Sequence, residues 1–101
     1  MRGTWQLFDE PVELIEQRFR YFPRLFRWRG QRYEVESIDR CWVVARPGWR
    51  RRVERRFFRV QCGSGTYDLY QDLRTGIWHL RRARLGAVQA TSRRQAVLAW
   101  R

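Results

Sequence analysis

The chain has 101 residues, of which 44% are hydrophobic and 16% aromatic, so its length and composition exclude a disordered segment and fit one domain with an aromatic core. All 22 basic side chains are arginines, and with only 10 acidic residues the formal charge is +12. The charge is uneven, because residues 1–16 carry one arginine and four acids, net −3, which leaves +15 for the rest. A cationic body favours polyanionic partners, with nucleic acid first and an anionic membrane surface second.

No apolar run approaches the roughly 20 residues of a membrane-spanning helix. The N-terminal stretch also lacks the apolar core of a signal peptide. We therefore expect a cytoplasmic protein with no membrane span.

The first part of the chain predicts one short strand and a loop. Asp9-Glu10-Pro11 is typical of a turn, and residues 12–15 alternate as a first strand, at an edge of the sheet. Residues 17–24 are expected to form a connecting loop, because Pro23 cannot donate a hydrogen bond within a central strand.

A hairpin is predicted next. Residues 25–28 alternate apolar and basic side chains, and Gly30-Gln31 stands where a two-residue turn would. The returning strand runs over residues 33–44, with a change of apolar parity that indicates a bulge near Ser37. Residues 45–53 then read as a loop.

Residues 55–82 predict an antiparallel meander of three strands. Its apolar positions alternate between turns at Gly63-Ser64-Gly65 and at residues 72–76. We expect Asp68 to be the counterion of a cross-strand arginine and Asp72 to cap the second turn.

After the meander, Ser92 and Gln95 form a capping box before a short helix at residues 96–100. The predicted fold class is therefore mainly all-β: a small antiparallel β-barrel or curled sheet of five to six strands, SH3-like or OB-like, with a short C-terminal helix. Residues 1–101 form a single domain, with a β core at 8–83 and a tail at 84–101. An open two-layer α+β arrangement is the alternative.

Aromatic and turn positions carry a resemblance to a known family. They are Phe8-Asp9-Glu10-Pro11-Val12, Phe26-Arg27-Trp28-Arg29-Gly30, Tyr33 with Val35, Tyr67-Asp68-Leu69-Tyr70 with Asp72, and Thr75-Gly76-Ile77-Trp78 with Leu80. Over about residues 7–83 the chain resembles a family of short bacterial domains of unknown function, associated with GC-rich genomes and with the neighbourhood of error-prone DNA polymerase genes. The resemblance implies the fold and a possible link to DNA repair, and it carries over no functional residues.

Catalytic and cofactor chemistry is not expected. His79 is the single histidine and is expected on the surface or in cross-strand packing. Cys41 and Cys62 are expected to be reduced, small buried hydrophobes. With no C-x-x-C pair and too few ligands for structural zinc, the sequence predicts no metal, cofactor or small-molecule substrate.

The candidate site is the most cationic loop together with the strand after it. Its nucleic-acid-binding residues are Arg46, Trp49, Arg50, Arg51, Arg52 and Arg55. An exposed Trp49 would stack a base while the arginines hold phosphates, and the alternative is that Trp49 packs back onto the sheet.

The sheet adds a charged outer surface, from Arg27, Arg29, Arg32, Arg55 and Arg59, which Glu34, Glu36 and Asp39 would partly neutralise.

Two functions follow from these features. The first is a non-catalytic nucleic-acid-binding domain, with the accessory role in DNA repair that the resemblance implies. The second is a protein-interaction module that docks onto a larger bacterial assembly through an exposed sheet edge or an aromatic groove, suggested by Tyr21, Phe22 and Trp100.

Overall fold

The computed structural model describes residues 4–46, 53–63 and 65–85. They form seven strands: β1 (Gln6–Arg18), β2 (Phe22–Trp28), β3 (Gln31–Glu34), β4 (Ser37–Arg46), β5 (Val53–Cys62), β6 (Gly65–Asp72) and β7 (Trp78–Leu85). The all-β class is confirmed, while the predicted five to six strands fall short of the seven observed. The described residues contain no helix. The helix predicted at residues 96–100 lies outside them.

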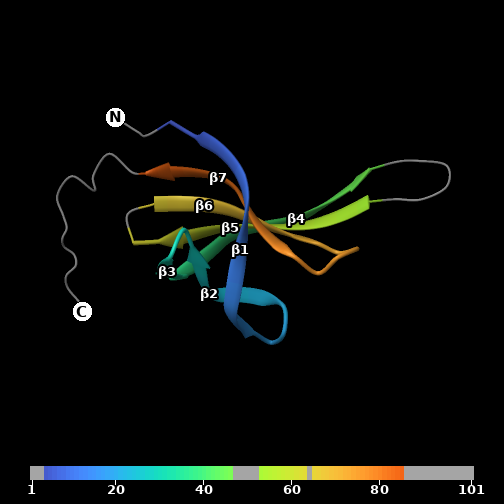
Figure 1. The fold of residues 1–101 in the computed structure, drawn as a ribbon, viewed down its shortest axis with the longest axis horizontal. Coiled ribbons are helices and arrows are strands. Elements are labelled where there is room, and N and C mark those ends of the chain that lie inside the picture. Colours follow the sequence, from blue (N-terminus) through green and yellow to red (C-terminus); the bar gives the residue numbers. More distant parts are fainter. Residues whose placement is uncertain (1–3, 47–52, 64, 86–101) are drawn as a thin grey trace.

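The strands form one antiparallel sheet in the order β3-β2-β1-β7-β6-β5-β4. The first half of β1 pairs with β7 and its second half with β2, so β1 turns away from β4–β7 and carries β2 and β3 with it (Figure 1). The end strands β3 and β4 are joined directly by Val35 and Glu36. The amide of Val35 donates to the Arg24 carbonyl at 2.7 Å, and that of Glu36 donates to the Gln61 carbonyl at 2.8 Å. The predicted curled sheet is therefore a half-barrel whose two ends are tied by this link.

The turn predicted at Asp9-Glu10-Pro11 is wrong, because these residues lie inside β1. Asp9 has a φ of 55°, and the pairing with β7 shifts register between Leu7 and Glu10. A residue with positive φ inside a ladder produces a β-bulge, so the turn-like composition bends the strand without ending it. As a result β1 is a long central strand and not the short edge strand expected.

The loop predicted at residues 17–24 is also mostly strand. The reversal is confined to residues 19–21, where Phe19 and Arg20 both have positive φ. Pro23 is buried in β2 and pairs with Gln17 of β1. The pairing of β2 with β3 ends at Leu25, so the missing N–H of Pro23 faces no β3 partner.

The predicted hairpin is present, with its turn one residue earlier than expected. Trp28 pairs with Gln31, and Arg29 and Gly30 between them have φ of 53° and 80°. Two positive φ values define the type I′ turn that suits a two-residue hairpin. The bulge expected near Ser37 is present as a register shift between Ile38 and Arg40, and the long strand predicted over residues 33–44 is also broken at residues 35–36.

The meander of β5, β6 and β7 agrees with the prediction, and its alternate residues form the centre of the core. Phe26, Phe58, Val60, Leu69 and Leu80 are completely buried. The cap at Asp72 is confirmed, since its side chain accepts a hydrogen bond from the Arg74 amide at 2.9 Å. These residues fill the concave side of the half-barrel and leave the opposite side of β4–β7 for other contacts.

The two cysteines are free, and they differ in environment. Cys62 is buried in the core, and burial raises the pKa of its thiol. Cys41 is exposed on β4, so the prediction of two buried thiols is right only for Cys62.

Candidate nucleic-acid interface

The side of β4–β7 that faces away from the core carries a row of four rings. Successive residues of a strand point to opposite sides of a sheet, so Phe57 and Tyr70 lie on the other side from Phe58 and Leu69, where they too are buried, at 8% and 3% exposure. Trp42 pairs with Phe57, Phe57 with Tyr70, and Tyr70 with His79. We call these four side chains the ring row, and the side of the sheet that bears them the outer face.

The rings of the row stand side by side. The centroids of Trp42 and Phe57 are 5.2 Å apart at 10°, those of Phe57 and Tyr70 5.0 Å at 36°, and those of Tyr70 and His79 4.8 Å at 13°. The packing role predicted for His79 is therefore confirmed. Within the row the ring faces cover one another. Trp42 ends the row on β4, the last strand of the sheet, and it is half-buried.

The bulge in β1 holds one inner ring of the row, Tyr70. The hydroxyl of Tyr70 donates to Oδ1 of Asp9 at 2.8 Å, and Arg81 lies 3.4 Å from the other carboxylate oxygen of Asp9. Burial, together with this hydrogen bond, raises the pKa of Tyr70 to about 12. The neutral phenol is therefore locked in place over the whole physiological pH range.

A second row runs next to the first and is made of arginines around one buried carboxylate. Arg40 pairs with Arg59, Arg59 with Asp68, and Asp68 with Arg82. Asp68 is only 1% exposed. It accepts two hydrogen bonds from Arg59, at 2.8 and 3.0 Å, and one from Arg82 at 2.9 Å. We call these residues the arginine row; they confirm the predicted cross-strand counterion.

The arginine row keeps a net positive charge. The hydrogen bonds with Asp68 raise the pKa of Arg59, so that guanidinium stays charged. One carboxylate faces two guanidiniums, and the side chains of Arg59 and Arg82 remain 22% and 37% exposed. Asp68 therefore fixes the direction of both arginines and leaves each of them in contact with solvent.

Guanidiniums and rings are interleaved across the outer face. Trp5 lies among three arginines, with its ring centroid 4.9 Å from Arg59, 4.2 Å from Arg82 and 4.7 Å from Arg84. The guanidinium of Arg40 lies 4.8 Å from the Trp42 ring. Such cation–π pairs place positive charge next to apolar surface, as in proteins that bind a phosphate backbone and its bases together.

The structure describes two of the six predicted site residues. Arg55 lies on the outer face, with its guanidinium 4.9 Å from the ring centroid of Tyr70. Arg46 is the last residue of β4 and pairs with Val53 of β5, at the far end of the hairpin in Figure 1. Trp49, Arg50, Arg51 and Arg52 lie outside the described residues.

Four aromatic residues of this surface were not among the predicted site residues: Trp5, Trp42, Phe57 and Tyr70. The sequence does contain a signal for the pairs formed between β5 and β6. A two-residue turn after Cys62 sets the register of β5 and β6, so it pairs Phe57 with Tyr70 and Arg59 with Asp68.

The acids that neutralise β2 come from β1. Arg27 is paired with Glu13 at 3.1 Å, and Arg29 makes two hydrogen bonds to Glu10 at 2.9 and 2.6 Å. Trp28 Nε1 also donates to Glu10 at 2.9 Å, and the bonds from Arg29 and Trp28 lower the pKa of that carboxyl. The expected pairing of Arg27 and Arg29 with Glu34 and Glu36 is wrong, because β2 lies between β3 and β1 and these two arginines pair with the acids of β1.

This pairing divides the charge between two parts of the molecule. Residues 4–34 contain six arginines and five acids, net +1. The described residues from 35 to 85 contain nine arginines and five acids, net +4. The positive field is therefore concentrated on the strands that bear the outer face.

Other chemistry finds little support in the described part of the chain. No group of three or more His, Cys, Asp or Glu side chains there is placed to hold a metal ion. No helix among the described residues is long and apolar enough to cross a membrane.

Comparison with known proteins gives one family. The family described as "Domain of unknown function (DUF6504)" matches residues 3–93. The match covers most of the chain, which therefore belongs to the DUF6504 family, and the resemblance to domains of unknown function is confirmed at that level. No curated protein and no solved structure matches the chain.

Proposed function

We propose that this DUF6504 domain is a non-catalytic nucleic-acid-binding domain of a cytoplasmic bacterial protein, accessory to DNA repair. The observation that carries the binding role is the ring row lying beside the arginine row on one face of the sheet. The resemblance to bacterial domains near error-prone polymerase genes supports the repair context.

The arginines would supply the attraction to phosphate. Guanidiniums bind phosphate oxygens through paired N–H groups, and neutralising the backbone releases counterions. Asp68 uses only some of the N–H groups of Arg59 and Arg82. The remaining ones, together with Arg40 and Arg84, are the proposed phosphate contacts.

The tryptophans would supply the contact to bases. Inside the ring row the faces are covered by neighbouring rings, so a base would stack at the end of the row, on Trp42, or on Trp5, and would displace a guanidinium that lies over that ring. Because such stacking needs an unpaired base, single strands are the favoured targets. The predicted site residues Arg46, Trp49, Arg50, Arg51 and Arg52 stay part of the proposal on the ground of their composition.

A salt titration tests the proposal. Binding of a fluorescein-labelled oligo-dT strand, followed by anisotropy at 50 to 200 mM salt, should weaken linearly on a log–log plot, with about 0.7 in slope for each phosphate contact. The double variant Arg40→Ala/Arg84→Ala should lose at least tenfold in affinity at low salt, and its slope should fall by about 1.4.

The matched control removes two exposed arginines from the β2–β3 hairpin, as Arg27→Ala/Arg32→Ala. It changes the net charge equally and should stay within about twofold of the unmodified protein. Equal losses in both double variants would mean that binding follows total charge and not this surface. Absence of binding at low salt would refute the proposal as a whole. Unchanged binding after Arg50, Arg51 and Arg52 are all replaced by Ala would remove the loop from it.

A second measurement isolates stacking. Trp42→Leu keeps an apolar contact with Phe57 and removes the indole face. Loss of one stacked base corresponds to about 1–3 kcal/mol. Equal affinity of Trp42→Leu and the unmodified protein would exclude Trp42 as the base contact.

A protein-interaction module docking onto a larger bacterial assembly is the second candidate. The exposed edge of β4 favours it, since Val43 and Val44 there are 57% and 42% exposed. Of the aromatics that first suggested this role, Tyr21 and Phe22 pack against Phe58, with centroids 5.5 and 6.0 Å away. A partner retained at high salt would favour this role over nucleic-acid binding.

A further inference from the structure

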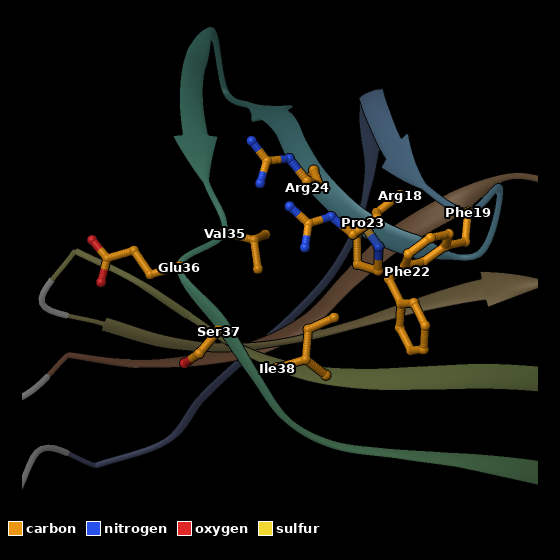
Figure 2. Close-up of a pocket in the computed structure, with 9 residues that line it drawn as sticks. All are labelled: Arg18, Phe19, Phe22, Pro23, Arg24, Val35, Glu36, Ser37 and Ile38. Atoms are coloured by element: carbon orange, nitrogen blue, oxygen red, sulfur yellow. The ribbon is translucent and has the colours of Figure 1, made fainter.

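A pocket of about 350 Å³ lies where the two ends of the half-barrel meet. It is formed by the start of β2, the turn before it, and the link between β3 and β4 (Figure 2). Its floor is apolar and consists of Phe22, Pro23, Val35 and Ile38. These residues contact or belong to the core, so the floor is held by the fold itself.

Two arginines stand over this floor. In Figure 2 the guanidiniums of Arg18 and Arg24 lie on the same side of the pocket, above the level of Ile38. Neither makes an ion pair with a described residue. The acid in the lining, Glu36, points away from the pocket and accepts a hydrogen bond from the Gly63 amide at 3.2 Å. The pocket therefore combines an apolar floor with a positive rim.

We propose that this pocket binds an apolar side chain flanked by carboxylates, presented by an extended acidic segment of a partner protein. The apolar side chain would fill the space above Val35 and Ile38. The flanking carboxylates would pair with Arg18 and Arg24.

The lining favours a peptide over a nucleobase. A base carries hydrogen-bonding groups around its edge, and burying them without partners is unfavourable by several kcal/mol. The pocket floor offers no polar side chain to meet them, because the Ser37 hydroxyl is turned away, as Figure 2 shows. The volume is at the low end for ligand sites, which suits one side chain better than a larger ligand.

Two neighbouring features extend the proposed contact. Phe19, at the rim, is 81% exposed, which makes it the most exposed large apolar side chain described. The backbone of β4 begins beside the pocket at Ser37, and its outer edge has no strand partner in the described sheet. An extended peptide could add main-chain hydrogen bonds along this edge while its side chain enters the pocket.

The test uses the full chain and three synthetic peptides, Gly-Asp-Asp-X-Asp-Asp-Gly with X as Phe, Leu or Ala. Anisotropy of the labelled peptides should give at least tenfold tighter binding for Phe than for Ala, with Leu between them. NMR titration with the Phe peptide should shift the methyl signals of Val35 and Ile38.

The variant Arg18→Ala/Arg24→Ala should bind the Phe peptide at least tenfold more weakly than the unmodified protein. The control Arg27→Ala/Arg32→Ala should change the affinity for this peptide less than twofold. Equal binding of the Phe and Ala peptides, or no binding of any, would overturn the proposal. Oligo-dT that shifts the same methyl signals at lower concentration than the peptide would also overturn it and assign the pocket to nucleic acid. Arg18 and Arg24 lie off the outer face, so their double variant should still bind oligo-dT if the nucleic-acid role is correct. Loss of peptide binding with oligo-dT binding retained therefore separates the two proposals.

Discussion

Replacing Asp68 by asparagine removes the charge at the centre of the arginine row. Asp68 has a 2% exposed side chain and faces the guanidiniums of Arg59 and Arg82. Removing one partner of a fully buried ion pair destabilises a protein by about 3–5 kcal/mol, because the other charge is left unpaired. Here the two arginines are 22% and 37% exposed, so water solvates part of the charge left behind. We therefore expect Asp68→Asn to lower the free energy of unfolding by about 2–3 kcal/mol.

Urea denaturation followed by tryptophan fluorescence measures this change. With a denaturant dependence of about 1–3 kcal/mol per M, the midpoint should fall by roughly 0.7–3 M. Glu13→Gln is the control, since its ion pair with Arg27 is exposed, with side chains 63% and 45% accessible. An exposed pair contributes at most about 1 kcal/mol. If Asp68→Asn destabilises no more than Glu13→Gln, the arginines do not depend on Asp68, and our account of the row is wrong.

Three further predictions concern titration and the hairpin turn. The pKa of Tyr70 is raised from 10.0 to about 12 in the folded state, so the stability it contributes is complete below pH 10 and is lost as the pH rises towards 12. Tyr70→Phe should therefore show a shallower loss of urea midpoint than the unmodified protein between those pH values. The pKa of Glu10 is lowered from 4.5 by Arg29 and Trp28, so its contribution is present above that value and is lost in acid. Glu10→Gln should be less stable than the unmodified protein at pH 7, and the difference should narrow at pH 3. Gly30 has a φ of 80°, so Gly30→Ala should destabilise by about 1 kcal/mol, seen as a thermal midpoint about 4–8 °C lower.

The elements predicted well from the sequence are those fixed by local signals. Alternation and turn glycines define β5, β6 and β7, and the register across a two-residue turn follows from the turn itself. The turn between β2 and β3 lies one residue earlier than predicted, because Arg29 adopts a positive φ that local preference assigns to glycine. Asp68 was assigned to a cross-strand arginine from opposite-charge pairing alone, and the structure places it opposite Arg59, buried and not on a solvated face.

The elements predicted wrongly are those that depend on distant contacts. Asp9 resembles a turn residue, and its place in a bulge of β1 is set by Tyr70, 61 positions away in the chain. Pro23 resembles a strand breaker, and it is accommodated because β3 ends before reaching it. Likewise, the pocket depends on the approach of β2 to the β3–β4 link, and no spacing in the sequence records that approach.

The position of Asp68 bears on how the outer face would bind an anion. A free arginine side chain has about 2 kcal/mol of rotamer entropy, part of which is lost when it contacts a phosphate. Arg59 and Arg82 are already oriented by their hydrogen bonds to Asp68, so less entropy remains to be lost on binding. The same carboxylate neutralises one unit of positive charge and so weakens the long-range attraction. The two effects separate with ionic strength, because salt screens the attraction and leaves the orientation unchanged. In an outer face of this kind, Asp68 would weaken the long-range attraction of an anion and would make its short-range contact with Arg59 and Arg82 more specific.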